Sequence, residues 1–139
     1  MQDTLPEILR PLMAAPSITL GHCAICGRRE PIEKHHIVRR GAGKLFIQGH
    51  ELPKPTITLC GFGNNLRDAN GRYLCHGLAH ANMLHFRWVP EVKKTQDSAG
   101  EHFYQTGHLE YLRCEHPTKY EIALQMDGWK PLPRWRDAL

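Results

Sequence analysis

The chain has 139 residues and a formal net charge of +4 when its histidines are neutral. This length indicates one domain with a modest core, and small domains often gain stability from a bound metal or a disulfide. No apolar run is long enough to span a bilayer, and the first residues lack the basic and apolar regions of a signal peptide. We therefore expect a cytoplasmic protein with no membrane partner, in which paired cysteines are metal ligands rather than disulfides.

The first twenty residues (1–20) predict an N-terminal helical segment that packs on the core. Residues 3–15 carry an apolar stripe at helical spacing, and Pro6 suits the first turn of a helix. Pro11 is unfavourable inside a helix, and Pro16 ends it. The stripe consists of Leu5, Ile8, Leu9 and Leu12.

Residues 21–90 contain most of the histidines and cysteines, and we expect them to form the functional domain. Strands are predicted over 31–38 and 56–59, with a loop at 41–43 and another in the Gly- and Asn-rich stretch 61–71. The apolar spacing from Tyr73 to Trp88 predicts a helix with Leu74, Leu78 and His85 on one face. Pro90 is expected to stop this helix.

Residues 91–139 contain no further paired cysteines or histidines and predict a C-terminal extension that packs on the core. Residues 92–100 are polar and predict a loop, whereas 103–104 and 109–114 predict strands. Residues 120–126 are compatible with a strand or a short helix. The Pro- and Trp-rich end predicts an extended segment.

Four of the five cysteines have the character of zinc ligands. Cys23 and Cys26 are separated by two residues, a spacing that lets one tight turn bind an ion through two thiolates. Cys60 and Cys75 complete a tetrahedral set if the residues between them loop out. The alternative is that Cys60 and Cys75 are small buried residues and that the CxxC pair is redox-active or fortuitous. We expect Cys114 to be a buried free thiol.

Two pairs of histidines have a spacing suited to a second metal site. His35 and His36 end a predicted strand, so their side chains point to opposite faces, and one can bind a metal while the other meets a substrate. His76 and His80 lie one helical turn apart on the same side of a predicted helix. Each pair alone also fits ordinary surface histidines. Their proximity in sequence to the zinc cysteines favours a metal centre.

Together, these motifs resemble those of the HNH endonucleases, especially the zinc-containing form frequent in phage and bacterial genomes. The family pattern is CxxC, then (D/H)-H-I, then a strand ending L-C-G, then C-H-G-x-x-H. This chain reads Cys23-Ala-Ile-Cys26, His35-His36-Ile37, Leu59-Cys60-Gly61 and Cys75-His76-Gly77-Leu78-Ala79-His80. The match covers residues 23–80, a little under half of the chain.

The resemblance implies an α+β fold: a small ββα-metal (His-Me) finger stabilised by a structural zinc on four cysteines, with an N-terminal helix and a C-terminal extension. It implies that His36 is the general base that activates water. It also implies that a catalytic divalent ion (Mg²⁺, Mn²⁺, Ni²⁺ or Zn²⁺) is bound by His35, His76 and His80. The implied activity is metal-dependent hydrolysis of the phosphodiester bonds of DNA.

One position departs from the family pattern. The family usually has an Asn five residues before the third cysteine, where it orients the loop of the catalytic histidine. Here that position is Pro55, and Asn64, Asn65 or Asn70 are the candidates to replace it. This departure weakens the prediction of turnover more than the prediction of the fold.

The expected partner is DNA in its double-stranded form, with RNA left open. Arg39, Arg40 and Lys44 follow the proposed base closely and are the expected phosphate contacts, with His85 and Arg87 as weaker candidates. The family resemblance also suggests a phage packaging protein or other protein partner, in the cytoplasm of a bacterial host or phage-infected cell. The alternative function is a non-catalytic zinc-ribbon module that binds nucleic acid or protein.

Overall fold

The computed structural model describes residues 4–63 and 67–134, and its N-terminal element is the 3-10 helix η1 (Glu7–Ala14). The sequence predicted a helical segment here, and the tighter 3-10 form has a clear cause. Pro11 inside the helix has no amide hydrogen to donate, so a regular α-helix cannot continue through it. Leu5 and Leu12 are buried as expected, but Ile8 is 36% exposed, so the predicted stripe is only partly covered.

Strands β1 (Ile32–His36) and β4 (Thr56–Cys60) form an antiparallel pair, with Ile32 opposite Cys60 and His36 opposite Thr56. Ile57 and Leu59 are fully buried. Thr58 is also buried, and its hydroxyl oxygen accepts a hydrogen bond of 3.0 Å from the amide of Leu20, which offsets the cost of burying a polar group. Both predicted strands are therefore present, and their pairing places His35 and His36 next to the segment that ends in Cys60.

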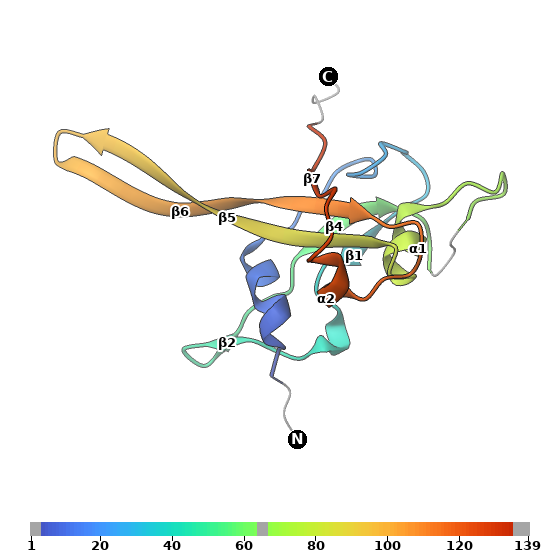
Figure 1. Ribbon diagram of the computed structural model, residues 1–139, viewed down its shortest axis with the longest axis horizontal. Coiled ribbons are helices and arrows are strands. Elements are labelled where there is room, and N and C mark those ends of the chain that lie inside the picture. Colours follow the sequence, from blue (N-terminus) through green and yellow to red (C-terminus); the bar gives the residue numbers. More distant parts are fainter. Residues whose placement is uncertain (1–3, 64–66, 135–139) are drawn as a thin grey trace.

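The connection between β1 and β4 contains a small element that the sequence did not reveal. A one-turn 3-10 helix η2 (Arg40–Ala42) follows β1, and strands β2 (Phe46–Ile47) and β3 (His50–Glu51) form a short hairpin. Gln48 and Gly49 both have positive φ in its two-residue turn, a conformation that matches the twist of the two strands. This hairpin extends from the lower part of the molecule in Figure 1.

Helix α1 (Cys75–His80) is much shorter than the predicted helix over 73–88. The chain leaves the helix at Asn82, which has a φ of 60°. The amides of Asn82 and Met83 donate to the carbonyls of Ala79 and Leu78, at 3.2 and 2.9 Å, as in a Schellman C-cap. The prediction that Leu74, Leu78 and His85 share one helical face is therefore wrong, because His85 lies in the next strand.

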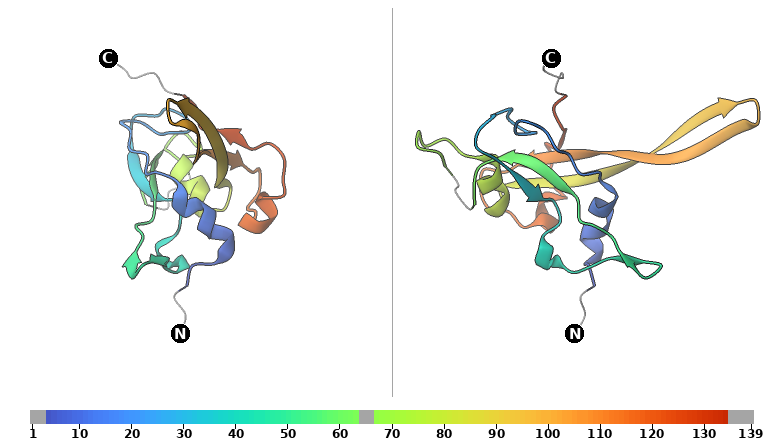
Figure 2. Two further views of the ribbon diagram at one scale, coloured as in Figure 1. Left: turned by 90° about the vertical axis from the view of Figure 1, so that its left-hand side faces the viewer. Right: turned by 180° about the vertical axis from the view of Figure 1, so that it is seen from behind.

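Strands β5 (Leu84–Asp97) and β6 (Gly100–Arg113) form a long antiparallel ribbon, paired from Leu84–Arg113 to Asp97–Gly100. The prediction of a polar loop at 92–100 is wrong. Both faces of the outer ribbon are exposed to solvent, so this part has no alternating apolar pattern from which a strand could be recognised. Pro90 lies within β5 and is tolerated there because β5 is an edge strand. Figures 1 and 2 show the ribbon extending well beyond the rest of the molecule.

The C-terminal part folds back across the base of the ribbon. The short helix α2 (Tyr120–Ala123) realises one of the two structures predicted for 120–126. Strand β7 (Lys130–Pro131) then pairs with β6 at Glu110 and Tyr111. The Tyr120 hydroxyl donates to the Phe86 carbonyl at 2.7 Å, which attaches this C-terminal part to the core.

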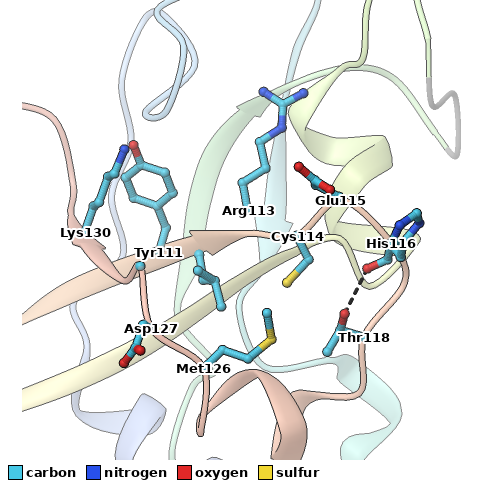
Figure 3. A pocket seen from close by; sticks show the side chains of 11 residues that line it. Tyr111, Arg113, Cys114, Glu115, His116, Thr118, Met126, Asp127 and Lys130 are labelled. Carbon is cyan, nitrogen blue, oxygen red and sulfur yellow. Dashed lines mark hydrogen bonds between the residues drawn. The ribbon is translucent and has the colours of Figure 1, made fainter.

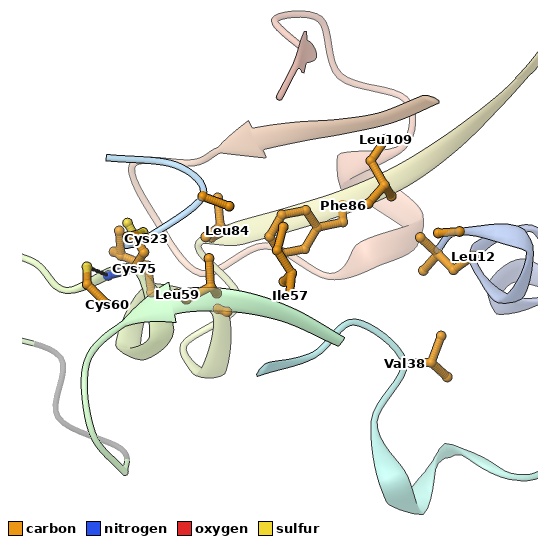
Figure 4. Close-up of a cluster of buried hydrophobic side chains, with 14 of the residues drawn as sticks. Leu12, Cys23, Val38, Ile57, Leu59, Cys60, Cys75, Leu84, Phe86 and Leu109 are labelled. Atoms are coloured by element: carbon orange, nitrogen blue, oxygen red, sulfur yellow. Dashed lines mark hydrogen bonds between the residues drawn. The ribbon is translucent and has the colours of Figure 1, made fainter. Parts of the chain in front are cut away.

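The main hydrophobic core lies between β4 and the base of β5. Figure 4 shows Ile57 and Leu59 of β4 facing Leu84 and Phe86 of β5, and these four side chains are at most 4% exposed. The cysteines Cys23, Cys60 and Cys75 belong to the same buried cluster. The core therefore ends directly at the cysteine cluster, which fixes the start of α1 relative to β4.

Candidate functional site

The four predicted zinc cysteines meet although they come from three parts of the chain. Cys23 and Cys26 lie in the loop before β1, Cys60 ends β4 and Cys75 begins α1. All four sulfur atoms lie within 4.8 Å of one another, and the sulfurs of Cys26 and Cys60 are 3.6 Å apart. Four sulfurs around a zinc ion lie about 3.8 Å apart at ordinary bond lengths. The cluster could therefore hold a structural metal such as zinc.

The local backbone prepares this cluster for thiolates. The amide of Cys75 donates to the Cys60 sulfur at 3.2 Å, and the amide of Gly27 donates to the Cys23 carbonyl at 3.0 Å, closing the turn between the first two cysteines. Gly27 has a φ of 81°, which suits glycine. Cys23, Cys60 and Cys75 are buried, whereas Cys26 is exposed.

The electrostatics of the cluster also favour a bound cation. Hydrogen bonding from the Cys26 and Cys60 side chains lowers the pKa of Cys23 well below its usual value. The neighbouring sulfurs of Cys23 and Cys26 raise the pKa of Cys75 well above its usual value. Four thiols in such contact cannot all ionise unless a positive ion compensates their charge. The alternative that Cys60 and Cys75 are unrelated to the CxxC pair does not fit this arrangement.

Three of the four predicted site histidines form a second cluster. His35 comes from β1, and His76 and His80 come from α1. One ring nitrogen of each lies within 4.8 Å of the others, and the Nε2 atoms of His76 and His80 are 3.0 Å apart. Imidazole nitrogens on one tetrahedral ion lie about 3.3 Å apart. The donor set and its spacing therefore fit a divalent transition-metal ion.

The surroundings of His35 and His76 keep these two rings neutral. Burial, together with the neighbouring rings of His76 and His80, lowers the pKa of His35 to about 3. Burial, and next the proximity of His80, also lower the pKa of His76. A neutral imidazole has a free lone pair on one nitrogen, which is the form that binds a metal. His35 and His76 are therefore in their ligand form at neutral pH.

Gly61 explains how the two clusters come so close together. It follows Cys60 directly, with a φ of 133°. A Cβ atom at this position would lie 2.9 Å from the Cβ of His76. A larger residue at position 61 would therefore push His76 away from the end of β4.

His36 lies beside the histidine cluster but is not among its metal-ligand candidates. Neighbouring residues of β1 point to opposite sides, which separates His36 from His35. Both nevertheless line the same groove, whose volume is about 1110 Å³. Partial burial, followed by the charges of Arg40 and Lys54, lowers the pKa of His36. A neutral imidazole open to the groove can accept a proton.

The groove is basic. Its charged lining comprises the four cationic side chains of Lys34, Arg39, Arg40 and Lys119 and the carboxylate of Glu121. The guanidinium of Arg39 donates to the side-chain oxygen of Asn82 at 2.9 Å. Sequence reasoning found Arg39 and Arg40 but missed Lys34 and Lys119. Lys119 is far from the motifs in sequence, and only the packing of α2 brings it to the groove.

The other predicted phosphate contacts lie in different environments. Lys44 is not one of the groove-lining residues, and its amine lies 3.9 Å from a carboxylate oxygen of Glu51. His85 lines the groove, but its Nε2 contacts the carbonyl oxygen of Asn82 at 3.0 Å. Arg87 is not one of the lining residues, and its guanidinium forms a 2.6 Å ion pair with Glu110.

Two hydrogen bonds hold the loop that follows His36. The amide of Ile37 donates to the carbonyl of Pro55 at 3.0 Å, and the amine of Lys54 donates to the carbonyl of Arg40 at 2.7 Å. Of the three candidates for the expected Asn, Asn64 and Asn65 lie outside the described residues. Asn70 is exposed, and its backbone amide donates a hydrogen bond to the Asp68 carboxylate. The loop is therefore attached at the position of Pro55 by a backbone carbonyl and a neighbouring lysine.

A second cavity, of about 520 Å³, lies between the end of β6 and the segment after α2. Figure 3 shows Arg113, Glu115 and His116 around it, with the Thr118 hydroxyl bonded to the His116 carbonyl. Cys114 is buried there as a free thiol, as predicted. None of the predicted metal or catalytic residues lines this cavity, so we do not assign the site to it.

Comparisons with protein-family models, with curated proteins and with solved structures find no match to this chain. Among the residues that the structure describes, no helix is long and apolar enough to cross a membrane.

Proposed function

We propose that this protein is a metal-dependent HNH-type endonuclease that hydrolyses the phosphodiester bonds of DNA. The observation that carries the proposal is the meeting of His35, His76 and His80 at ligand distance in a basic groove that His36 also lines. Histidine pairs at these spacings occur by chance in a sequence. Their convergence from a strand and a helix is much more specific.

The order of the elements supports the proposed ββα-metal finger. Two antiparallel strands, β1 and β4, are followed by α1, and the histidine ligands come from the first strand and the helix. The cysteine cluster joins the end of β4 to the start of α1. In this proposal, a structural zinc bound by the four cysteines holds α1 next to β1, so that His76 and His80 face His35.

The residues of the groove would have distinct roles in phosphodiester hydrolysis. The divalent ion, when bound by the three histidines, supplies Lewis acidity at a phosphate oxygen and at the leaving group. His36 accepts a proton from the attacking water through its free ring nitrogen. Arg39, Arg40, Lys34 and Lys119 hold the phosphates of the strand, which gives affinity without sequence selectivity.

The alternative function is a non-catalytic zinc-ribbon module that binds nucleic acid or protein. The cysteine cluster alone is compatible with it, because that cluster requires no second metal. The histidine cluster and His36 have no role in such a module. The two functions therefore differ in one testable respect: only the nuclease requires His36.

A plasmid-nicking assay with Mg²⁺, Mn²⁺, Ni²⁺ or added Zn²⁺ tests the proposal. We expect the wild-type protein to relax supercoiled DNA, and we expect His36→Ala to slow cutting by about 100-fold or more, the usual contribution of a general base. The matched control is His116→Ala, which removes a histidine outside the groove. Absence of wild-type cutting in every metal would contradict the nuclease, and wild-type cutting by His36→Ala would assign the base to another residue.

A further inference from the structure

Glu33 lies on β1 two residues before His35, so the two side chains share one side of the strand. That side faces α1. An oxygen of the Glu33 carboxylate lies 3.0 Å from Nδ1 of His76. Neither the cysteine motif nor the histidine motif includes Glu33, and sequence reasoning did not select it.

The His76 nitrogen that faces Glu33 is otherwise isolated. His76 is 6% exposed, and its Nδ1 atom is fully buried. Across residues 4–63 and 67–134, no atom meets full hydrogen-bond geometry with this nitrogen, and Glu33 approaches it at ion-pair distance. A buried polar atom without a partner is costly, so the Glu33 carboxylate is the group that can satisfy it.

The carboxylate itself is held in place from the other side. The backbone amide of Gly63 donates to both carboxylate oxygens of Glu33, at 3.0 and 3.2 Å. A side chain that is 37% exposed on a strand would otherwise be free to turn into solvent. The two hydrogen bonds from Gly63 therefore hold the Glu33 carboxylate beside His76.

The contact with Glu33 determines which nitrogen of His76 carries the hydrogen. An ionised carboxylate only accepts hydrogen bonds, so a neutral His76 must carry its hydrogen on Nδ1. The lone pair is then on Nε2, which is the atom that lies 3.0 Å from Nε2 of His80. Glu33 thus leaves the metal-facing nitrogen of His76 free to act as a ligand.

We propose that Glu33 is a positioning residue of the histidine cluster, which fixes the Nδ1–H tautomer and the ring orientation of His76 for binding a divalent transition-metal ion. This inference rests on the proposed function, because the ion in question is the one proposed for His35, His76 and His80. It extends that proposal to the residues that orient the ligands. It also links the start of the 61–74 segment, through Gly63, to the metal centre.

The first test requires no second metal. Two-bond ¹H–¹⁵N spectra of protein that carries one zinc per chain, at the cysteines, report the tautomer of each histidine. We expect His76 to be in the Nδ1–H form in the wild type and in Glu33→Gln, whose side-chain amide oxygen is still an acceptor facing Nδ1. In Glu33→Ala we expect a shift toward the Nε2–H form or a mixture. An unchanged Nδ1–H tautomer in Glu33→Ala would overturn the inference.

The second test measures metal affinity by calorimetric titration with Co²⁺ of protein that carries one zinc per chain, at the cysteines. Loss of a carboxylate partner of a metal-bound histidine weakens binding on the order of 10- to 100-fold, so we expect that loss for Glu33→Ala and a smaller one for Glu33→Gln. The matched control is Glu121→Gln, which removes a carboxylate from the groove lining but leaves the Glu33–His76 pair in place. We expect it to bind Co²⁺ as the wild type does.

The outcomes separate the two proposals. Wild-type Co²⁺ affinity in Glu33→Ala, with that affinity lost in His76→Ala, would overturn the role of Glu33 and leave the nuclease proposal intact. If Glu121→Gln lost as much Co²⁺ affinity as Glu33→Gln, the role of Glu33 would also be overturned. The loss would then come from removing any negative charge near the groove. A wild-type protein that binds no Co²⁺ at the histidines would contradict both proposals.

Discussion

The individual histidines of this protein differ in what surrounds them, and those differences define their chemistry. His35 is half-buried and His76 is buried, both next to other imidazoles, and both have lowered pKa values, which keeps their nitrogens available as ligands. His36 is one residue away from His35 and opens to the groove. His35 and His36 therefore have separate roles, because successive side chains of a strand point to opposite sides. That alternation could be predicted, whereas the participation of Glu33 could not, since no spacing rule relates it to His76.

His108 illustrates the opposite case, a histidine stabilised in its charged form. Its Nδ1 and Nε2 atoms lie 2.8 and 3.0 Å from carboxylate oxygens of Glu91 and Glu110. The hydrogen bond to Glu110, reinforced by Glu91, raises the pKa of His108. Arg87 also pairs with Glu110, so the cluster joins both strands at the base of the ribbon.

The raised pKa predicts a pH-dependent contribution of His108 to stability. A folded-state pKa above the unfolded value means that protonation favours the folded state. The contribution is complete below the ordinary histidine pKa of about 6.5 and disappears as the pH rises through the higher folded value. We expect the difference in unfolding midpoint between wild type and His108→Gln to shrink from pH 6 to pH 8.5. A difference that grew with pH would contradict the assignment.

At the scale of elements, short-range patterns predicted where structure begins better than where it ends. Strands β1 and β4 follow the predicted ranges closely, and all of their residues except Lys34 are partly or fully buried. The predicted helix over 73–88 fails because the apolar residues after His80 are also suited to a buried strand, and periodicity over a few residues cannot separate the two. The outer ribbon could not be predicted, because a ribbon with both faces in solvent has no alternation of apolar and polar residues in its sequence.

Asn82 is the residue that separates the helix from the strand. Its φ of 60° is unfavourable for a residue with an ordinary side chain, and a single residue in this conformation costs roughly 1–2 kcal/mol. We expect Asn82→Ala to lower the free energy of unfolding by about 1 kcal/mol relative to Asn82→Gly, since glycine accepts this φ. Both variants lose the hydrogen bond to Arg39 equally, so the comparison isolates the backbone. Equal stabilities in urea unfolding would show that the backbone of Asn82 is not the cause.

At the scale of the whole molecule, the cysteine cluster joins three parts of the chain. The loop before β1, the end of β4 and the start of α1 converge there, at the end of the hydrophobic core. The CxxC spacing predicted one half of the set. The other half could be predicted only by combining motifs, because the fourteen residues between Cys60 and Cys75 are a wide spacing for one zinc knuckle.

We expect the integrity of the α1 region to depend on the proposed zinc. The free energy of binding a structural zinc also contributes to folding, so its removal by a chelator is expected to unfold this region. We expect the Cys23→Ser protein to lose its zinc and to unfold without a cooperative transition. Cys114→Ser removes the one cysteine outside the cluster and is expected to keep one zinc per chain. A Cys23→Ser protein with full zinc content and wild-type stability would overturn the four-cysteine assignment.

We propose that a second divalent ion binds at the histidines, separate from the zinc proposed for the cysteines. A crystal of protein that carries one zinc per chain, soaked in Mn²⁺, with data collected at the manganese absorption edge, tests it most directly. We predict one anomalous peak within bonding distance of His35, His76 and His80, with the ring of His36 near it but not bound to it. A map with no manganese at these three histidines, or with His36 among the ligands, would contradict the account.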